Sequence, residues 1–397
     1  MGFDVRKIVK EKKKGITLIS LVITIIILLI LAGVTLSFLL GEKGIITRAK
    51  EAKVATQSAA VKEELTLSFA SWKIQEEPRT ALKEYLQNKE KSGLDGVKII
   101  EELNGEQGEI LVGMYQNYLF KISDQESIEV SKTPNLVKNG VLEEKSNANF
   151  EWATYKDNSL QYTNSSKITL ITKEYIEIDP NKKYYETITG KTNNTSAIYY
   201  MGIIEFDEDK NYIDGLHFMN INNTLTYLEQ DLNKGDTKVY LNDVSNFVSD
   251  RPDYTKGFIV WNYVNSKGYH YPELTYSRNV YPRLEESKTL FNETGIDREN
   301  NIITLKEPWS YENLKKGEKL SQRNAGDTYN YGLLKAGTMS TQWKTYHNYI
   351  EGINSTGESQ LNTFRPGTKY IKIVFLVNYS DIANVTTNYK NIVFVEM

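Results

Sequence analysis

The chain contains no cysteine, which excludes disulfide bonds, thiol catalysis and cysteine metal sites. Its stability must come from a buried core, which a chain of 397 residues can supply. Only 8 prolines are present, against 27 tyrosines, and this balance argues against a disordered stalk and for a folded β-rich region. The formal charge is −3, so nothing indicates nucleic acid as a partner.

Catalytic motifs are also missing. The three histidines are isolated in the sequence, and neither HExxH nor Gly-x-Ser-x-Gly occurs. Glu285 and Glu286 are adjacent, but glycoside hydrolysis needs two carboxyl groups that face each other about 5–10 Å apart. We therefore predict no enzyme and no catalytic residues, and an anchored glycan hydrolase stays only as a third alternative.

The longest apolar run extends from Ile16 to Leu40 and contains no charged residue. Roughly 20 apolar residues in a helix span a hydrocarbon core of about 30 Å, so this run predicts a transmembrane helix. Lysine and arginine dominate the residues before it, and such an excess stays on the cytoplasmic side. The C-terminal bulk is therefore expected to be extracellular.

The segment Lys14-Gly15-Ile16-Thr17-Leu18-Ile19, followed by a long β-branched helix, resembles the prepilin leader of type IV pilins and pseudopilins of Gram-positive anaerobes. The resemblance covers roughly residues 12–69. It implies cleavage after Gly15 and methylation of Ile16 by a prepilin peptidase, with other pilin-like subunits and the membrane as partners, at the cell surface or in a pilus. The family's usual glutamate is replaced by Ser20, which predicts poor filament assembly because the N-terminal amine loses its ionic partner. An uncleaved signal anchor is the alternative.

Periodicity and turn signals divide the chain into four parts. These are a leader at 1–15, a transmembrane and pilin-type helix at 16–77, a small head of helix plus β-sheet at 78–132, and a β-sandwich at 133–397 with a β-rich insertion at about 228–334. The predicted fold class is therefore α+β: a long N-terminal transmembrane helix, a small antiparallel β head, and a large all-β jelly roll carrying a small inserted β-domain.

The last part alternates apolar and polar residues, as in Tyr175–Lys191 and Phe364–Tyr379. Together with the closing strand Asn391–Met397, these segments resemble the galactose-binding-like jelly rolls of carbohydrate-binding modules. The resemblance implies a polysaccharide, on a surface or in the environment, as a partner.

The insertion holds the densest aromatic cluster of the chain. Exposed rings can stack on sugar faces, with a hydrogen-bonding side chain beside them. The candidate carbohydrate-binding residues are Trp261, Tyr263, Tyr269, Tyr271 and Arg278. The alternative left open is that these rings form the core of the insertion, because buried aromatic residues dominate small β cores.

One segment has the alternating oxygen ligands of a calcium loop, at Asp207, Asp209 and Asn211. The glycine and the terminal glutamate of an EF-hand are absent, and a solvated hairpin turn is the alternative. No cofactor is predicted, and a structural calcium ion is left open.

These observations predict a pilin-like structural or adhesion protein that displays a carbohydrate-binding β-sandwich outside the cell. The alternative is a minor pseudopilin of a secretion or DNA-uptake-like machine, without a ligand of its own.

Overall fold

The structure is a computed structural model of the whole chain. It describes residues 18–40, 44–76, 80–105, 108–123, 127–142, 149–150, 153–213, 216–249, 257–261, 277–281, 289–329, 334–353, 362–365 and 367–397. The chain forms two compact units, residues 1–60 and 61–397, and each is described by itself.

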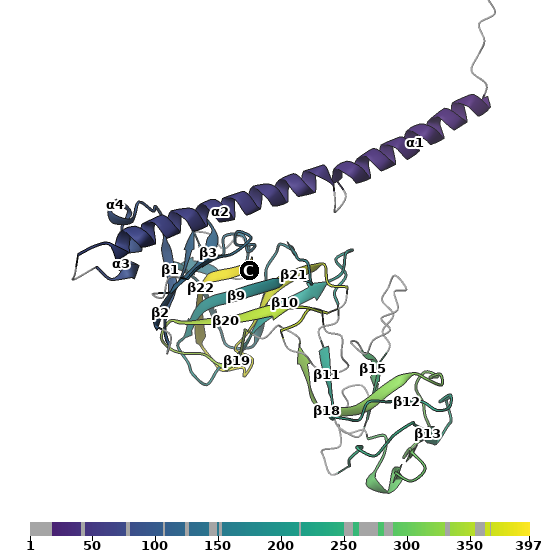
Figure 1. Cartoon of the computed structure of the whole chain (residues 1–397). Helices are drawn as coiled ribbons and strands as arrows, with labels where there is room; N and C mark the ends of the chain where they lie inside the picture. The colour runs from purple at the N-terminus through teal and green to yellow at the C-terminus, as the bar shows by residue number, and fades with distance from the viewer. Residues whose placement is uncertain are drawn as a thin grey trace, which may run out of the picture. The chain divides into compact units, whose positions relative to one another are not determined.

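The first unit contains helix α1 (Leu18–Leu40) and the beginning of helix α2 (Ile45–Lys73), as Figure 1 shows. The described side chains of α1 run from Leu21 to Leu36 and are all exposed. The uncharged residues of this stretch, rich in leucine and isoleucine, account for its helical form, because few of them compete with the backbone for hydrogen bonds.

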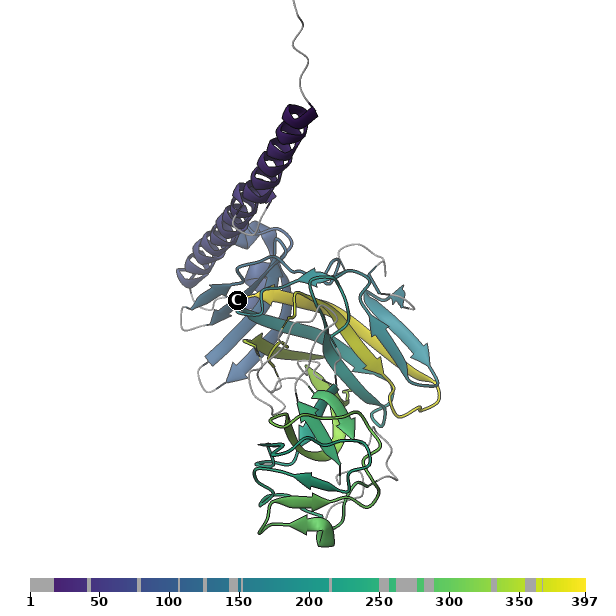
Figure 2. The ribbon, with the colours of Figure 1, turned by 90° about the vertical axis from the view of Figure 1, so that its right-hand side faces the viewer.

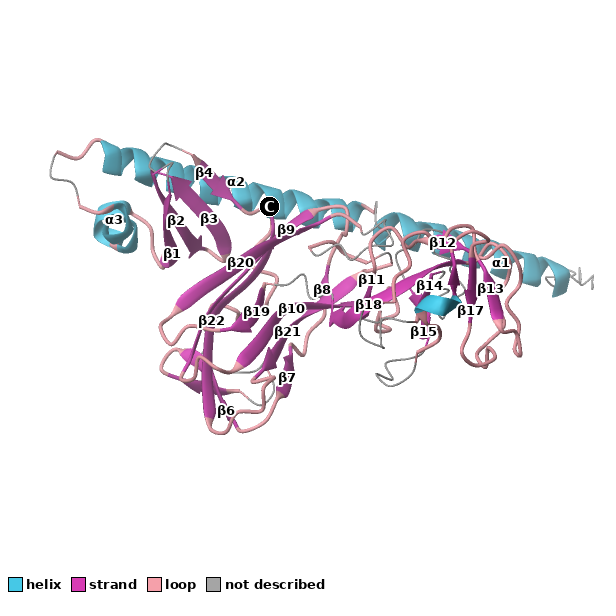
Figure 3. Ribbon diagram, turned by 90° about the horizontal axis from the view of Figure 1, so that it is seen from below, coloured by secondary structure: helices cyan, strands magenta, loops and turns pink. Residues whose placement is uncertain are grey.

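Within the described residues, no helix combines the length and the apolar character that crossing a membrane requires. The predicted α+β fold with a transmembrane helix is therefore wrong for the described chain, which is mostly β (Figure 3). The predicted membrane-anchored localisation is corrected with it, because it rested on that helix.

The second unit begins with a small head. The C-terminal half of α2 packs on a four-stranded antiparallel meander in the order β1-β2-β3-β4. The bounds are β1 Lys98–Gly105, β2 Gly108–Tyr115, β3 Tyr118–Ser123 and β4 Ile128–Val130, with the short helices α3 (Leu82–Gln87) and α4 (Lys89–Ser92) before them. Val61, Leu65 and Phe69 share a core with Tyr85 and Phe120. This apolar stripe at helical spacing fixes which face of α2 is buried.

The largest part is a β-sandwich of two five-stranded antiparallel sheets. Sheet 1 has the order β20-β9-β22-β6-β5, and sheet 2 has the order β19-β10-β21-β7, with β8 also paired to β21. The bounds are β5 Thr154–Lys156, β6 Ser159–Asn164, β7 Ile168–Ile171, β8 Ile176–Glu177, β9 Lys183–Thr192, β10 Ile198–Phe206, β19 Lys335–Thr338, β20 Lys344–Glu351, β21 Tyr370–Val377 and β22 Val385–Glu396. Inward side chains of both sheets form one core, in which the rings of Phe375 and Tyr389 stack with centroids 4.7 Å apart.

An insertion separates β10 from β19 and builds its own sheets, teal to green in Figure 2. Its strands are β11 Leu216–Asn220, β12 Thr226–Tyr227, β13 Lys238–Tyr240, β14 Phe258–Trp261, β15 Ser277–Tyr281, β16 Ile296–Asp297, β17 Ile302–Thr304 and β18 Lys319–Tyr329, with a 3-10 turn at Glu293–Gly295. Phe247, Phe258, Phe291 and Trp309 lie in a core distinct from that of the sandwich. The insertion thus has a core of its own in which aromatic rings are prominent.

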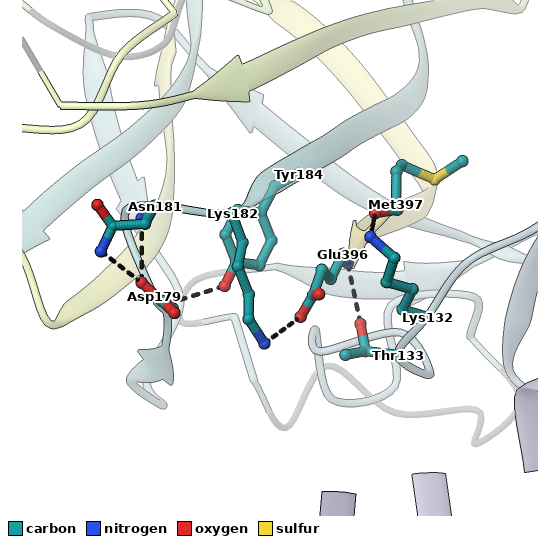
Figure 4. Close-up of polar contacts among 8 residues, drawn as sticks. All are labelled: Lys132, Thr133, Asp179, Asn181, Lys182, Tyr184, Glu396 and Met397. Carbon is teal, nitrogen blue, oxygen red and sulfur yellow. Dashed lines mark hydrogen bonds and ion pairs between the residues drawn. The ribbon is translucent and has the colours of Figure 1, made fainter. Parts of the chain in front are cut away.

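The segment that joins the head to the sandwich is attached to the end of β22 (Figure 4). Thr133 Oγ1 accepts a hydrogen bond from the backbone N–H of Glu396 at 2.9 Å, and Lys182 Nζ lies 2.9 Å from Glu396 Oε2. Lys132 Nζ also donates to the backbone oxygen of Met397. These contacts secure the end of β22 against both the linker and the β8–β9 turn.

Candidate functional site

The sequence-predicted sugar site does not provide an exposed stacking ring in the described residues. Trp261 lies in β14 with only 4% of its surface exposed, and its Nε1–H donates to Ser321 Oγ at 2.8 Å. Trp261 therefore lies in a buried strand and presents no exposed ring. Tyr263, Tyr269 and Tyr271 lie outside the described residues, and Arg278 is placed only by its backbone, in β15.

The candidate calcium ligands form a turn after β10. Asp207 accepts hydrogen bonds from the backbone N–H groups of Asp209 (2.9 Å) and Asn211 (2.8 Å) and from Asn211 Nδ2 (3.2 Å). The carboxylate of Asp207 thus organises the hairpin. No group of three histidine or acidic side chains suited to a metal occurs in the part of the chain that the structure describes.

The predicted cleavage site is not tested by the structure. Gly15 and Ile16 are outside the described residues, so cleavage and methylation there stay a prediction. Glu285 and Glu286 are outside them as well.

The outer face of sheet 1 offers a different site. In β9 the side chains of Tyr184 and Ile188 point into the sandwich core, so those of Thr189 and Lys191 point outward. Thr345 of β20 pairs with Thr189, and Lys390 of β22 pairs with it from the other side. Outward residues of three adjacent strands therefore form one continuous row.

A β-bulge in β22 divides this outer face into two halves. The register with β9 shifts between Lys390 and Val393, and Asn391 has a positive φ of 50°. After the bulge, Val393 and Val395 point outward and pack with Met114 and other residues of the head sheet. Before the bulge, the outward residues are polar and belong to no core shared with the head, although Thr189 (4% exposed) and Asn388 (8% exposed) are buried among their neighbours.

Trp343 lies at the β20 edge of this polar half. It immediately precedes β20, its side chain is 36% exposed, and it is the exposed tryptophan among those described. The ammonium groups of Lys191 and Lys390 lie 4.8 Å and 4.4 Å from its ring centroid, within the range of cation–π attraction. We call this half of sheet 1 the Trp343 face, defined by Trp343, Thr345, Thr189, Lys191, Thr386, Asn388, Lys390, Gln161 and Thr163.

Hydroxyl and amide groups surround the ring. The Oγ1 atoms of Thr189 and Thr345 are 3.0 Å apart, as are those of Thr163 and Thr386. Asn391 Nδ2 donates to Thr189 Oγ1 at 3.3 Å. These cross-strand contacts hold the polar side chains in place. Thr189 is buried beneath its neighbours, whereas Thr163 is exposed and its hydroxyl keeps spare capacity for a ligand's hydroxyl group.

The two lysines influence each other. Burial lowers the pKa of Lys390, and the positive charge of Lys191 lowers it further. Neither lysine takes part in an ion pair within the described residues. The Trp343 face thus carries two neighbouring, uncompensated positive charges beside a flat aromatic ring.

A second group of rings and lysines lies on sheet 2. The rings of Tyr175 and Tyr370 have centroids 6.1 Å apart, and Lys210 Nζ lies 4.9 Å from the first and 5.3 Å from the second. Here the rings pack on one another, so they are less available as a flat platform than the ring of Trp343. This group provides matched control residues for the first.

The sequence analysis overlooked Trp343, Lys191 and Lys390. Two signals could have found them: polar residues alternate at Thr386, Asn388 and Lys390, and an isolated tryptophan precedes a strand otherwise rich in polar residues. Both signals are less conspicuous in the sequence than the dense aromatic cluster in the insertion.

Comparison with known proteins identifies no family for this chain. No protein-family model and no curated protein matches the chain. Among solved structures, the chain is similar to "Family 16 Carbohydrate Binding Module-2", with 9% sequence identity and a TM-score of 0.23, over 66% of this chain and 100% of that one. At so low a TM-score, the likeness does not bear on function.

Proposed function

We propose that the sandwich is a non-catalytic carbohydrate-binding domain and that the Trp343 face holds the polysaccharide. The observation that carries this proposal is Trp343, 36% exposed at the edge of a polar sheet face with two lysines beside its ring. A tryptophan in this setting presents a flat apolar surface to the C–H groups of a sugar, while neighbouring hydroxyl, amide and ammonium groups bind its oxygens. The proposal thus keeps the carbohydrate-binding sandwich of the sequence analysis and moves the site.

The size of the face suits an oligosaccharide. From β20 to β6 the face crosses three strand spacings, or about 14 Å. A ligand of several sugar rings can therefore contact Trp343 at one end and the Thr163–Thr386 pair at the other. Because these groups stand on paired strands, they are held in place before the ligand arrives, which lowers the entropic cost of binding.

The experiment compares the wild-type full chain with Trp343→Ala on a polysaccharide array, followed by titration with the best ligand. We expect roughly tenfold weaker binding by the variant, because a stacking contact contributes about 1–1.5 kcal/mol. Its melting temperature should change little, since the ring is exposed.

Tyr379→Ala is the matched control. Tyr379 is 44% exposed and carries Lys167 Nζ 5.4 Å from its ring centroid, but it follows β21 of sheet 2. This variant should bind like the wild type. If Trp343→Ala binds as well as the wild type, or if no polysaccharide binds, the proposal is wrong and the purely structural, ligand-free alternative stands.

A further inference from the structure

We infer that the ligand of the Trp343 face is an anionic polysaccharide, one whose sugar rings carry carboxylates. This inference rests on the proposed function and narrows its substrate class. It stands on the charge arrangement around one ring, on the absence of acidic side chains from the face, and on what a sugar must displace to reach the ring.

The two lysines lie together, and no carboxylate among the described residues pairs with either of them. Lys191 on β9 and Lys390 on β22 both direct their ammonium groups to the ring of Trp343, at 4.8 Å and 4.4 Å from its centroid. Two like charges this close repel each other, and the lowered pKa of Lys390 reflects that repulsion in addition to burial. A bound anion would relieve the repulsion.

The remaining members of the face offer no negative charge. All are threonine, asparagine or glutamine: Gln161, Thr163, Thr189, Thr345, Thr386 and Asn388. A carboxylate that enters this face therefore meets hydrogen-bond donors and two cations, and no described carboxylate of the face opposes it.

Another lysine on the same outer face shows the contrast. Lys183 lies 4.5 Å from the ring centroid of Tyr349, in a geometry like that of Lys191 over Trp343. Lys183 also has a carboxylate partner, since its Nζ is 3.6 Å from Glu351 Oε2. One ring-stacked lysine thus has an internal carboxylate partner, whereas the two at Trp343 have none among the residues that the structure describes.

The ring itself favours a charged sugar. A sugar that stacks on Trp343 must move at least one ammonium group away from the ring, at a cost of about 0.5–1 kcal/mol for an exposed cation–π contact. A neutral sugar returns that ammonium group to water. An anionic sugar keeps it in an ion pair beside the ring, so the lost contact is replaced.

The test uses a polyuronate and its fully methyl-esterified form, which present the same rings with and without charge. Titration calorimetry of the wild-type full chain should give roughly tenfold tighter binding of the polyuronate, with a preference that shrinks as salt is added. The double variant Lys191→Gln/Lys390→Gln should lose this preference and bind both polymers alike. Lys210→Gln, which removes a ring-stacked lysine from sheet 2, should keep the preference.

The outcomes separate the two claims. Equal affinity of the wild type for both polymers, or a preference that survives the double substitution, overturns the inference and leaves the proposed function intact. Binding of neither polymer, combined with no ligand on the polysaccharide array, overturns both. The comparison of the two polymers on the wild-type chain decides the inference even if the double variant does not fold.

Discussion

At the scale of the single residue, the burial of Glu186 makes the stability of the protein depend on pH. It lies on β9 between Tyr184 and Ile188, on the side that faces the sandwich core, and it is fully buried. Neither carboxylate oxygen has a hydrogen-bond partner in the structure. Desolvation by burial therefore raises its pKa well above the ordinary value of a glutamate, which favours the protonated carboxyl group in the folded protein.

The raised pKa makes stability fall as the pH rises. Below the ordinary pKa of a glutamate, the carboxyl group is protonated in both the folded and the unfolded chain, and folding loses nothing. Above it, the unfolded chain releases the proton and the folded chain does not, at a cost of up to about 1.4 kcal/mol per pH unit until the folded pKa is reached. We expect Glu186→Gln to remove this cost, so that its melting temperature exceeds that of the wild type by a margin that widens from pH 4 to pH 7.

The matched control for this prediction is Glu177→Gln, because Glu177 is an exposed glutamate in β8. Its melting temperature should follow that of the wild type across the same pH range. If the melting temperatures of Glu186→Gln and the wild type differ by the same amount at every pH, the prediction of a raised pKa for Glu186 is contradicted.

At the same scale, Trp261 and Trp343 show that the sequence does not predict which tryptophan is buried and which is exposed. Both residues precede or end strands, and both have tyrosines nearby in the sequence. Trp261 is 4% exposed because β14 is covered, whereas Trp343 is 36% exposed because it flanks an open half-sheet. Which face of a strand is covered depends on the packing of distant segments, and no local pattern reports it.

At the scale of the element, the bulge in β22 decides which side chains of the strand point outward before and after it. The side chain of Asn135 bridges the bulge: its Nδ2 donates to Ile392 O at 3.0 Å, and its Oδ1 accepts from the N–H groups of Phe394 (3.0 Å) and Val137 (3.1 Å). An asparagine outside the sheet thus satisfies backbone groups that the bulge would leave unpaired.

We predict that Asn135→Leu destabilises the protein by about 2–4 kcal/mol, because buried backbone groups lose their partners. Chemical denaturation of the full chain, followed by tyrosine and tryptophan fluorescence, measures the change. Asn181→Leu is the control, since Asn181 is exposed and bonds only to Asp179 in the described chain. A loss for Asn135→Leu no larger than for the control would contradict the role of Asn135 at the bulge.

The hairpin after β10 provides a second element-scale prediction. Asp207→Ala removes the acceptor of two backbone N–H groups and one amide, and we expect a loss of about 1–3 kcal/mol in unfolding free energy. Calcium at millimolar concentration should not restore the stability of this variant, because Asp207 acts here as a turn residue. The test is thermal melting of both proteins with calcium and with a chelator. If calcium strongly stabilises the wild type but not Asp207→Ala, the calcium loop is favoured over the turn.

Tight turns were readable from the sequence, and strand irregularities were not. The polar dipeptide Gln116-Asn117 between two apolar segments is a turn signal, and both residues have positive φ angles, of 48° and 67°, between the paired strands β2 and β3. The bulge at Asn391 changes which alternate residues face out, and the sequence pattern simply shows polar residues followed by apolar ones. An alternating sequence pattern does not show where a bulge reverses which residues of the strand point outward.

At the scale of the whole molecule, the sandwich assembles from segments far apart in the chain. β22, near the C-terminus, lies between β9 and β6, and β10 and β19 pair across the whole insertion. Alternating segments predicted many of these strands, but their order in the sheets follows from long-range packing. The membrane helix was the strongest local signal, and the structure's described residues correct it. Strength of a local pattern was thus a poor guide to the position of the site.

The most direct test of the central claim is the amide hydrogen-exchange footprint of the bound polysaccharide on the wild-type full chain. We predict slower exchange in peptides that cover residues 187–193, 341–347 and 386–391, because all three line the Trp343 face. Peptides that cover 200–206 and 370–377, in β10 and β21 of sheet 2, should exchange as in the free protein. Protection confined to sheet 2 or to the insertion, with none at Trp343, would contradict the account.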